Sequence, residues 1–319
     1  MAKMAKKMGL VWAFGLAVAL LSACGGQANS DSASQEAAAA AGDVQHVDPN
    51  AKIASMSIHM TNNLLALGIK PAGSVIGGGV GDFLPHVKDR LQGTVKLGVV
   101  TDPDMEAVIA LKPDDIFIEE QFGGQDRAKL EKIAPIVSMD LDKGTWRDQL
   151  KQLAEVVGRT QEADDFVKAY DEKTIEVRKL ISDELGDQAK VMAIRVSAKE
   201  IRVMSTSRPM GPIMFDDLQL TPANGVEKIA DGEPFEVISK EVLPDFDADA
   251  IFLIVNDDDN ARKVYGELEK NPLWQDLKAV KNHHVYALDG QKWLDYSALG
   301  QSMALDNMEQ LLRNEAAAS

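Results

Sequence analysis

The sequence predicts an α/β fold in which two Rossmann-like lobes are joined by a single long helix, with a ligand cleft between the lobes. From residue 52 onward, short β-branched runs alternate with helical patterns, which is typical of α/β proteins. The alternation stops over residues 145–185, where helical periodicity persists, and then resumes. A motif also recurs, because Glu106 precedes Ile116 by the same spacing that separates Glu241 from Ile251. Two lobes of one plan are therefore expected.

The first lobe is expected over residues 51–158. Gly68 and Pro71 end its first helix, and Asp102-Pro103 opens its second with an acidic cap followed by proline. Its strands are predicted at 52–58, 74–78, 94–100, 114–120 and 135–140, and its helices at 60–67, 104–111 and 125–134.

The linking helix is predicted over residues 159–187, after a break near Gly158. The second lobe then covers residues 188–319. Its strands are predicted at 191–197, 201–206, 235–239, 250–256 and 284–289, and its helices near 212–218, 240–246, 262–279 and 297–314.

The charge balance excludes several partners. The formal net charge is −16 at pH 7, which disfavours nucleic acid and anionic lipid headgroups. The only cysteine, Cys24, excludes an internal disulfide.

The N-terminus is typical of an export signal over residues 1–23. Three lysines within residues 3–7 precede an apolar run at 8–21, which is shorter than the roughly 20 residues of a spanning helix. The following Leu-Ser-Ala-Cys resembles a bacterial lipobox, which implies lipid modification of the Cys24 sulfur. Residues 24–50 are then a flexible tether. This predicts a lipid-anchored protein on the extracytoplasmic face of the cell membrane, and a buried apolar Cys24 is the alternative.

Glu106 and Glu241 allow two interpretations. An acid in the first turn of a helix stabilises it through the helix dipole. At equivalent places in two lobes, the pair also suits docking on a two-fold partner with basic sockets.

Motifs for catalysis or direct metal binding are missing from the sequence. No two histidines stand four residues apart, no G-x-S-x-G occurs, and Asp257–Asn260 lacks the glycine and distal glutamate of a calcium loop. We therefore expect a binding protein without catalytic residues, and a two-histidine metal site at His283-His284 is a weaker alternative.

Four residues near strand ends are ligand-binding candidates, since ligands of α/β lobes bind at that edge. They are Arg195, Arg208, Trp293 and Tyr296. A structural ion pair for Arg195 and a core position for Trp293 are the alternatives.

Several segments together resemble bacterial ABC-transporter solute-binding lipoproteins of the iron–siderophore and vitamin B12 class. They are "IASMSIHMTNNLLALG", "MEAVIALKPDDIFI", "LEKIAPIV", "NPLWQDLKAVKNHHVYALD" and "KWLDY", and the likeness extends over residues 50–313. The resemblance implies a monomer whose Glu106 and Glu241 engage arginines of a dimeric permease.

The resemblance also implies the ligand. "KWLDY" is similar to the "HWL-x-Y" stretch of hydroxamate-siderophore binders, with Lys292 in place of histidine. Catecholate binders usually carry several basic residues in the cleft, and few candidates occur here. A ferric hydroxamate is therefore favoured, with iron held by the siderophore and no protein cofactor. The alternatives are ferric citrate, a ferric catecholate, haem or a corrinoid, then a zinc or manganese importer's binding protein, and last a lipid-anchored enzyme.

Overall fold

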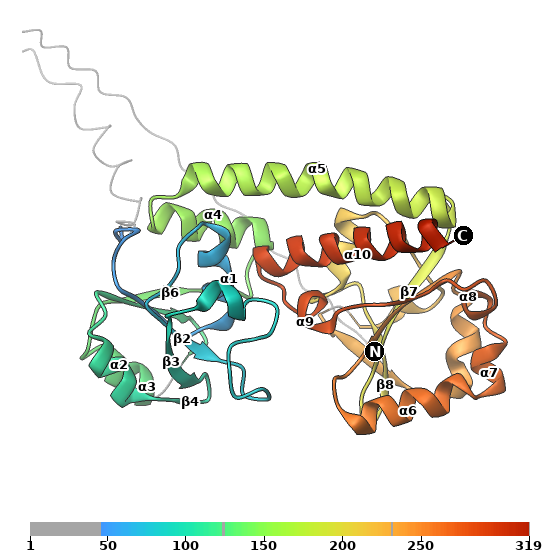
Figure 1. The fold of residues 1–319 in the computed structure, drawn as a ribbon, viewed down its shortest axis with the longest axis horizontal. Coiled ribbons are helices and arrows are strands. Elements are labelled where there is room, and N and C mark those ends of the chain that lie inside the picture. Colours follow the sequence, from blue (N-terminus) through green and yellow to red (C-terminus); the bar gives the residue numbers. More distant parts are fainter. Residues whose placement is uncertain (1–45, 123–124, 231, 319) are drawn as a thin grey trace, which may run out of the picture. The chain divides into compact units, whose positions relative to one another are not determined.

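The computed structural model describes residues 46–122, 125–230 and 232–318 (Figure 1). Two six-stranded sheets and one long helix organise the chain, which confirms the predicted α/β class. The predicted signal segment, Cys24 and most of the tether lie outside the described residues. Within the described ranges, no helix combines the length and the apolar character needed to cross a membrane.

The N-terminal lobe is built on a sheet with strand order β4-β3-β2-β1-β5-β6. All neighbours pair in parallel except β3 and β4, which are antiparallel. The strands are β1 (Ile53–Ser55), β2 (Gly73–Ile76), β3 (Val95–Val99), β4 (Asp102–Pro103), β5 (Asp115–Glu119) and β6 (Ile136–Met139). The helices between them are α1 (Ile58–Ala66), the 3₁₀-helix Lys88–Leu91, α2 (Met105–Leu111) and α3 (Gln125–Leu130).

The C-terminal lobe has a sheet with strand order β10-β8-β7-β11-β12, and β9 also pairs with β7. The strands β7, β11, β12 and β9 are parallel, whereas β8 is antiparallel to both of its neighbours. The strands are β7 (Lys190–Val196), β8 (Ile201–Met204), β9 (Thr221–Pro222), β10 (Phe235–Ile238), β11 (Ala250–Val255) and β12 (Val285–Ala287).

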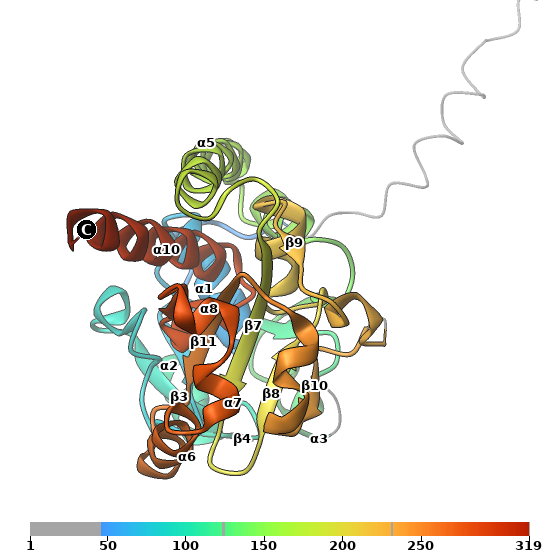
Figure 2. The same ribbon diagram turned by 90° about the vertical axis from the view of Figure 1, so that its right-hand side faces the viewer.

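Two long helices bridge the lobes. Helix α5 (Thr160–Leu185) follows α4 (Trp146–Val156) and packs against α10 (Ala298–Ala318), as both views show (Figures 1 and 2). Helix α10 also packs against α1 of the first lobe. One hydrophobic cluster beneath these helices includes Phe117 and Leu150 from the first half of the chain and Phe252 and Trp293 from the second. The lobes therefore share a continuous core.

The structure corrects three predicted helices of the C-terminal lobe. The helix predicted at 262–279 is three helices, because Asn271 caps a new helix that begins at Pro272. They are α6 (Asp259–Glu269), α7 (Pro272–Gln275) and α8 (Lys278–Lys281). The segment Lys240–Phe246 is a 3₁₀-helix with Pro244 inside it, and Pro212–Asp217 is a π-helix. The short 3₁₀-helix Val226–Lys228 and the helix α9 (Gly290–Trp293) complete the lobe.

Candidate functional site

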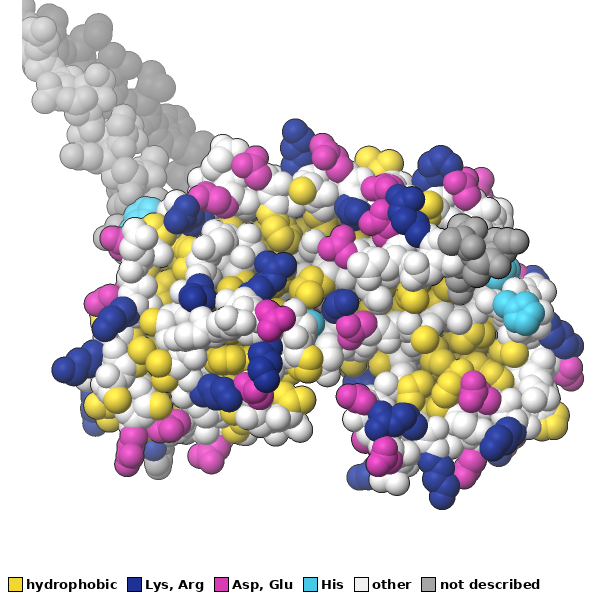
Figure 3. Space-filling view, in the orientation of Figure 1, with side chains coloured by type: hydrophobic (Ala, Val, Ile, Leu, Met, Phe, Trp, Pro, Cys, Tyr) yellow, Lys and Arg dark blue, Asp and Glu magenta, His cyan; other side chains and the backbone are white. Residues whose placement is uncertain are grey.

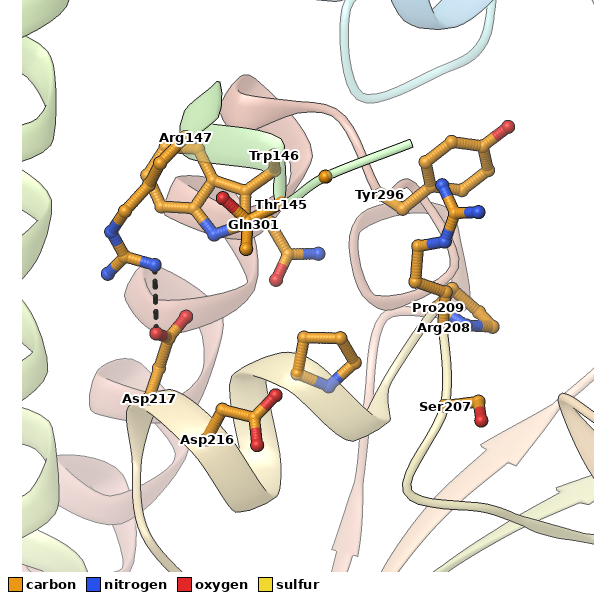
Figure 4. Close-up of a pocket in the computed structure, with 12 residues that line it drawn as sticks. Thr145, Trp146, Arg147, Ser207, Arg208, Pro209, Asp216, Asp217, Tyr296 and Gln301 are labelled. Carbon is orange, nitrogen blue, oxygen red and sulfur yellow. Dashed lines mark hydrogen bonds and ion pairs between the residues drawn. The ribbon is translucent and has the colours of Figure 1, made fainter. Parts of the chain in front are cut away.

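A pocket of about 290 Å³ lies where segments of both lobes meet, close to the start of α10 (Figure 4). In the space-filling view, the surface is hollowed between the two lobes at its lower edge (Figure 3). The pocket is lined by residues from three segments, which are Gly144–Arg147, Ser207–Asp217 and the stretch from Tyr296 to Gln301. A site built from both halves of the chain is the arrangement expected for ligand capture between lobes.

Tight turns place two of these segments. Thr145 caps α4 through its side chain and so fixes the direction in which Trp146 and Arg147 leave the helix start. The loop before the π-helix is closed by Gly211, where a Cβ atom would lie 1.9 Å from the carbonyl oxygen of Thr206. Only glycine permits this approach, which holds Arg208 at the pocket.

Arg147 is the centre of a polar network at one end of the pocket. Its guanidinium donates to Asp217 at 2.9 Å and to Asp171 at 2.7 Å, and it lies 4.4 Å from the ring centroid of Trp146. Tyr170 donates to the second oxygen of Asp217 at 2.8 Å. Burial, followed by the Asp217 charge, raises the pKa of the Tyr170 phenol well above its usual range. This network ties α4 and α5 to the π-helix.

Arg208 and Tyr296, two predicted ligand residues, meet at the other end of the pocket. The guanidinium of Arg208 lies 5.2 Å from the Tyr296 ring centroid and donates to the carbonyl of Leu141 at 2.5 Å. It also contacts Asp142 at 3.2 Å. Tyr296 also contacts His59, whose ring stacks on it at 3.7 Å between centroids. Burial, and then the charge of Glu119, raises the pKa of Tyr296 to about 12.

Asp295, beside Tyr296, was missed by sequence reasoning. Its carboxylate is only 4% exposed and accepts from Nδ2 of Asn62 at 2.7 Å and from the backbone N–H of Ser297 at 2.9 Å. Nε2 of His86 lies 3.0 Å away and Nδ1 of His59 lies 3.5 Å away. Burial alone would raise the pKa of this carboxyl, but the contacts with His59 and His86, together with the hydrogen bond from the Ser297 N–H, lower the pKa below its usual value.

His59 and His86, which are far apart in the sequence, converge on the Asp295 carboxylate. Their sequence spacing gave no indication of it, because tertiary packing brings them to Asp295. Even so, no group of three or more histidine, cysteine or acidic side chains suited to a metal ion occurs within the described part of the chain.

The structure places the other two predicted ligand residues away from the pocket. Trp293 has no exposed surface, packs near Phe252, and donates its indole N–H to Asn307 at 3.0 Å. A ring in that position cannot stack on a ligand, so the core alternative holds for Trp293. Arg195 lies on β7, where it donates to Asn256 at 2.9 Å and is not among the residues that line the pocket. Burial, and then the charge of Arg202, lowers its pKa.

Glu106 and Glu241 are both exposed, in the first turns of α2 and of the 3₁₀-helix Lys240–Phe246. Among the described residues, neither takes part in an ion pair. Ser239 hydrogen-bonds to Glu241 and lowers the pKa of its carboxyl. Both carboxylates are therefore accessible to a partner.

Comparison with known proteins agrees with this architecture. The chain belongs to the periplasmic binding protein family, which it matches over residues 60–292. It is 30% identical over 323 residues to the "Probable siderophore-binding lipoprotein YfiY" of Bacillus subtilis, covering 96% of this chain and 98% of that protein.

Two further relatives are informative. The "Iron(3+)-hydroxamate-binding protein FhuD" of Bacillus subtilis is 30% identical, over 89% of this chain and 90% of its own. The crystal structure of Staphylococcus aureus SirA complexed with staphyloferrin B has a TM-score of 0.71 at 25% identity, and covers 84% of this chain and 95% of that one.

Proposed function

We propose that this protein captures a ferric siderophore outside the cytoplasm and delivers it to an ABC importer. The observation that carries the proposal is the pocket between the lobes, with Arg208 stacked on Tyr296 at its edge. Three relatives described above bind, by their names, a siderophore, an iron(3+) hydroxamate and staphyloferrin B. We assign no enzymatic role, and the iron is carried within the ligand without a protein cofactor.

A hydroxamate chelate of low net charge is the favoured ligand. The two cations that line the pocket, Arg147 and Arg208, already contact Asp217 and Asp142. Little positive charge remains to attract a highly anionic ferric catecholate. Tyr296 offers an aromatic face, and the outer part of Arg208, which is 36% exposed, is available to donate to hydroxamate oxygens.

The proposed location and partner follow from the same assignment. A lipid on Cys24 would hold the protein at the membrane, and a monomer would dock on a dimeric permease through Glu106 and Glu241. The tether would raise the effective concentration of the binding lobes near that permease.

Tryptophan fluorescence tests the ligand assignment, because Trp146 lines the pocket. We expect saturable quenching by a ferric trihydroxamate and weak quenching by a ferric triscatecholate. The Tyr296→Ala and Arg208→Ala variants should lose affinity, whereas Arg90→Ala, at an exposed arginine outside the pocket, should not.

Two results would contradict the proposal. Tighter binding of the triscatecholate would remove the hydroxamate preference. Saturable Zn²⁺ binding that depends on His59 and His86, without a response to any iron chelate, would replace the siderophore assignment with that of a metal importer's binding protein.

A further inference from the structure

Asp216 is the acid of the pocket that no cation neutralises. Its neighbour Asp217 contacts Arg147 at 2.9 Å, and Arg208 is directed to Asp142 at 3.2 Å. Within the described ranges, the Asp216 side chain makes no hydrogen bond or ion pair with another residue. The Asp216 residue is exposed at the pocket, and desolvation, followed by the charge of Asp217, raises the pKa of its carboxyl.

Gln301, which lines the same pocket, holds a second unpaired acceptor. Its side chain is 2% exposed, and Nε2 donates to the backbone carbonyl of Asp295 at 3.3 Å. That bond fixes the amide orientation and leaves Oε1 buried without a hydrogen-bond partner in the protein. Figure 4 shows the Gln301 amide and the Asp216 carboxylate directed into one cavity from opposite sides. A buried acceptor without a donor is costly, so a ligand donor there would be favoured.

The remaining walls suit a methylene chain. Pro209 and Pro212 are apolar, and Trp146 contributes an aromatic surface whose indole N–H also lacks an acceptor. A volume of about 290 Å³ is just below the about 300–1,000 Å³ typical of small-molecule sites. It fits one arm of a chelate better than a whole ferric trihydroxamate.

We propose that this pocket binds a cationic arm of the siderophore, an alkylammonium whose N–H groups donate to the Asp216 carboxylate and to Oε1 of Gln301. The inference rests on the proposed function and adds a ligand subclass to it. The ferric hydroxamate core lies against Tyr296 and Arg208, while the arm enters the pocket beside Pro212. A primary ammonium carries three donors and one charge, which the two acceptors and the unpaired acid match.

The test compares two chelates that differ only at the arm. Ferrioxamine B ends in a free ammonium, and its N-acetylated derivative is the neutral counterpart. The full chain should bind the ammonium form roughly tenfold more tightly, equivalent to about 1.4 kcal/mol, as measured by calorimetric titration. Asp216→Asn should abolish this preference, because the charge pair is lost.

Two variants complete the design. Gln301→Met removes the acceptor at similar volume and should reduce the preference about threefold, with thermal unfolding used to confirm that the variant is folded. Asp245→Asn, at an exposed acid of the C-terminal lobe, should keep the full preference. Equal binding of the two chelates by the unmodified protein, or a preference that survives Asp216→Asn, would overturn the subsite alone. Failure of both chelates to bind would overturn the proposed function together with the subsite.

Discussion

Asn62 on α1 donates from its side-chain amide to the carboxylate of Asp295 at 2.7 Å, across 233 residues of chain. The next residue of α1 makes a second link, because Oδ1 of Asn63 accepts from the backbone N–H of Ala298 at 2.8 Å. The first helix of one lobe is thus hydrogen-bonded to the turn that opens the last helix of the chain. Tyr296 lies inside this turn, so the same bonds that join the lobes also position a proposed ligand residue.

Replacing Asp295 should destabilise the fold strongly. In Asp295→Asn, one carboxylate oxygen becomes an N–H group that faces existing donors, so two buried donors lose their acceptor. At about 1–3 kcal/mol for each unsatisfied group, the free energy of unfolding should fall by about 2–6 kcal/mol in urea titrations. Asp306→Asn, at an exposed acid of α10, should cost less than about 0.5 kcal/mol. Similar losses of unfolding free energy in the two variants would mean that the buried contacts of Asp295 add no more stability than an exposed acid does.

The stability of the protein should depend on pH through the protonation of the Asp295 carboxyl. Because its folded pKa is lowered from an unfolded value near 3.8, its contribution is present above about pH 4 and is lost as the pH falls through the folded pKa. Unfolding measured between about pH 2 and pH 5 should therefore show a steeper loss of stability below about pH 4 in the unmodified protein than in Asp295→Asn. Parallel curves would place the acid sensitivity at other groups.

Gly300 and Gly266 are both helical glycines, but only Gly300 is crowded by its neighbours. A Cβ atom at Gly300 would lie 2.3 Å from the carbonyl oxygen of Asp295, whereas nothing lies within 4 Å of one at Gly266 in α6. Gly300→Ala should destabilise the protein and weaken ligand binding, since the Asp295–Gln301 turn must shift. Gly266→Ala should instead stabilise it by about 0.5–1 kcal/mol through helix propensity. Thermal unfolding of both variants checks the opposite signs.

The Arg147 network should carry part of the stability at the junction of α4, α5 and the π-helix. Arg147→Met keeps the aliphatic volume but leaves Asp217 with Tyr170 as its remaining side-chain partner and removes the cation–π contact with Trp146. A loss of about 1–3 kcal/mol is expected from urea unfolding. Lys151→Met, at an exposed position of the same helix, is the control and should be close to neutral. If Arg147→Met leaves the free energy of unfolding unchanged, the cost of burying the ion pair cancels the attraction between its charges.

Docking through the two exposed glutamates predicts a separation of binding from transport. Glu106→Ala combined with Glu241→Ala should leave ligand affinity unchanged and abolish uptake in cells that express the cognate permease. The pair Glu155→Ala and Glu267→Ala, also exposed acids, should transport normally. Normal uptake by the first pair would leave Glu106 and Glu241 only their role in stabilising helix starts.

Local patterns predicted the fold well, because they act through neighbouring residues. The linking helix was expected from periodicity, and α5 begins at Thr160, just after the expected break at Gly158. Proline is also a local signal, and Pro272 could have indicated the helix start that divides residues 262–279.

The site was harder to predict, because its residues meet only through tertiary packing. Tyr296 and Arg208 could be chosen from strand-end position, but that rule also selected Trp293, which the core buries. His59, His86 and Asp295 have no diagnostic spacing, so no sequence motif could have brought them together. Buried acceptors such as Oε1 of Gln301 are visible only once every other hydrogen bond is assigned.

The continuous core beneath α4, α5 and α10 has a consequence for how a transporter would sense its cargo. Lobes that share one close-packed cluster cannot swing apart without exposing it, so large hinge motion is costly. The empty and loaded proteins would then present almost the same outline. Under the proposed function, the permease would distinguish them by the portion of the chelate left visible at the cleft mouth, and unloaded copies would compete for the same docking surface.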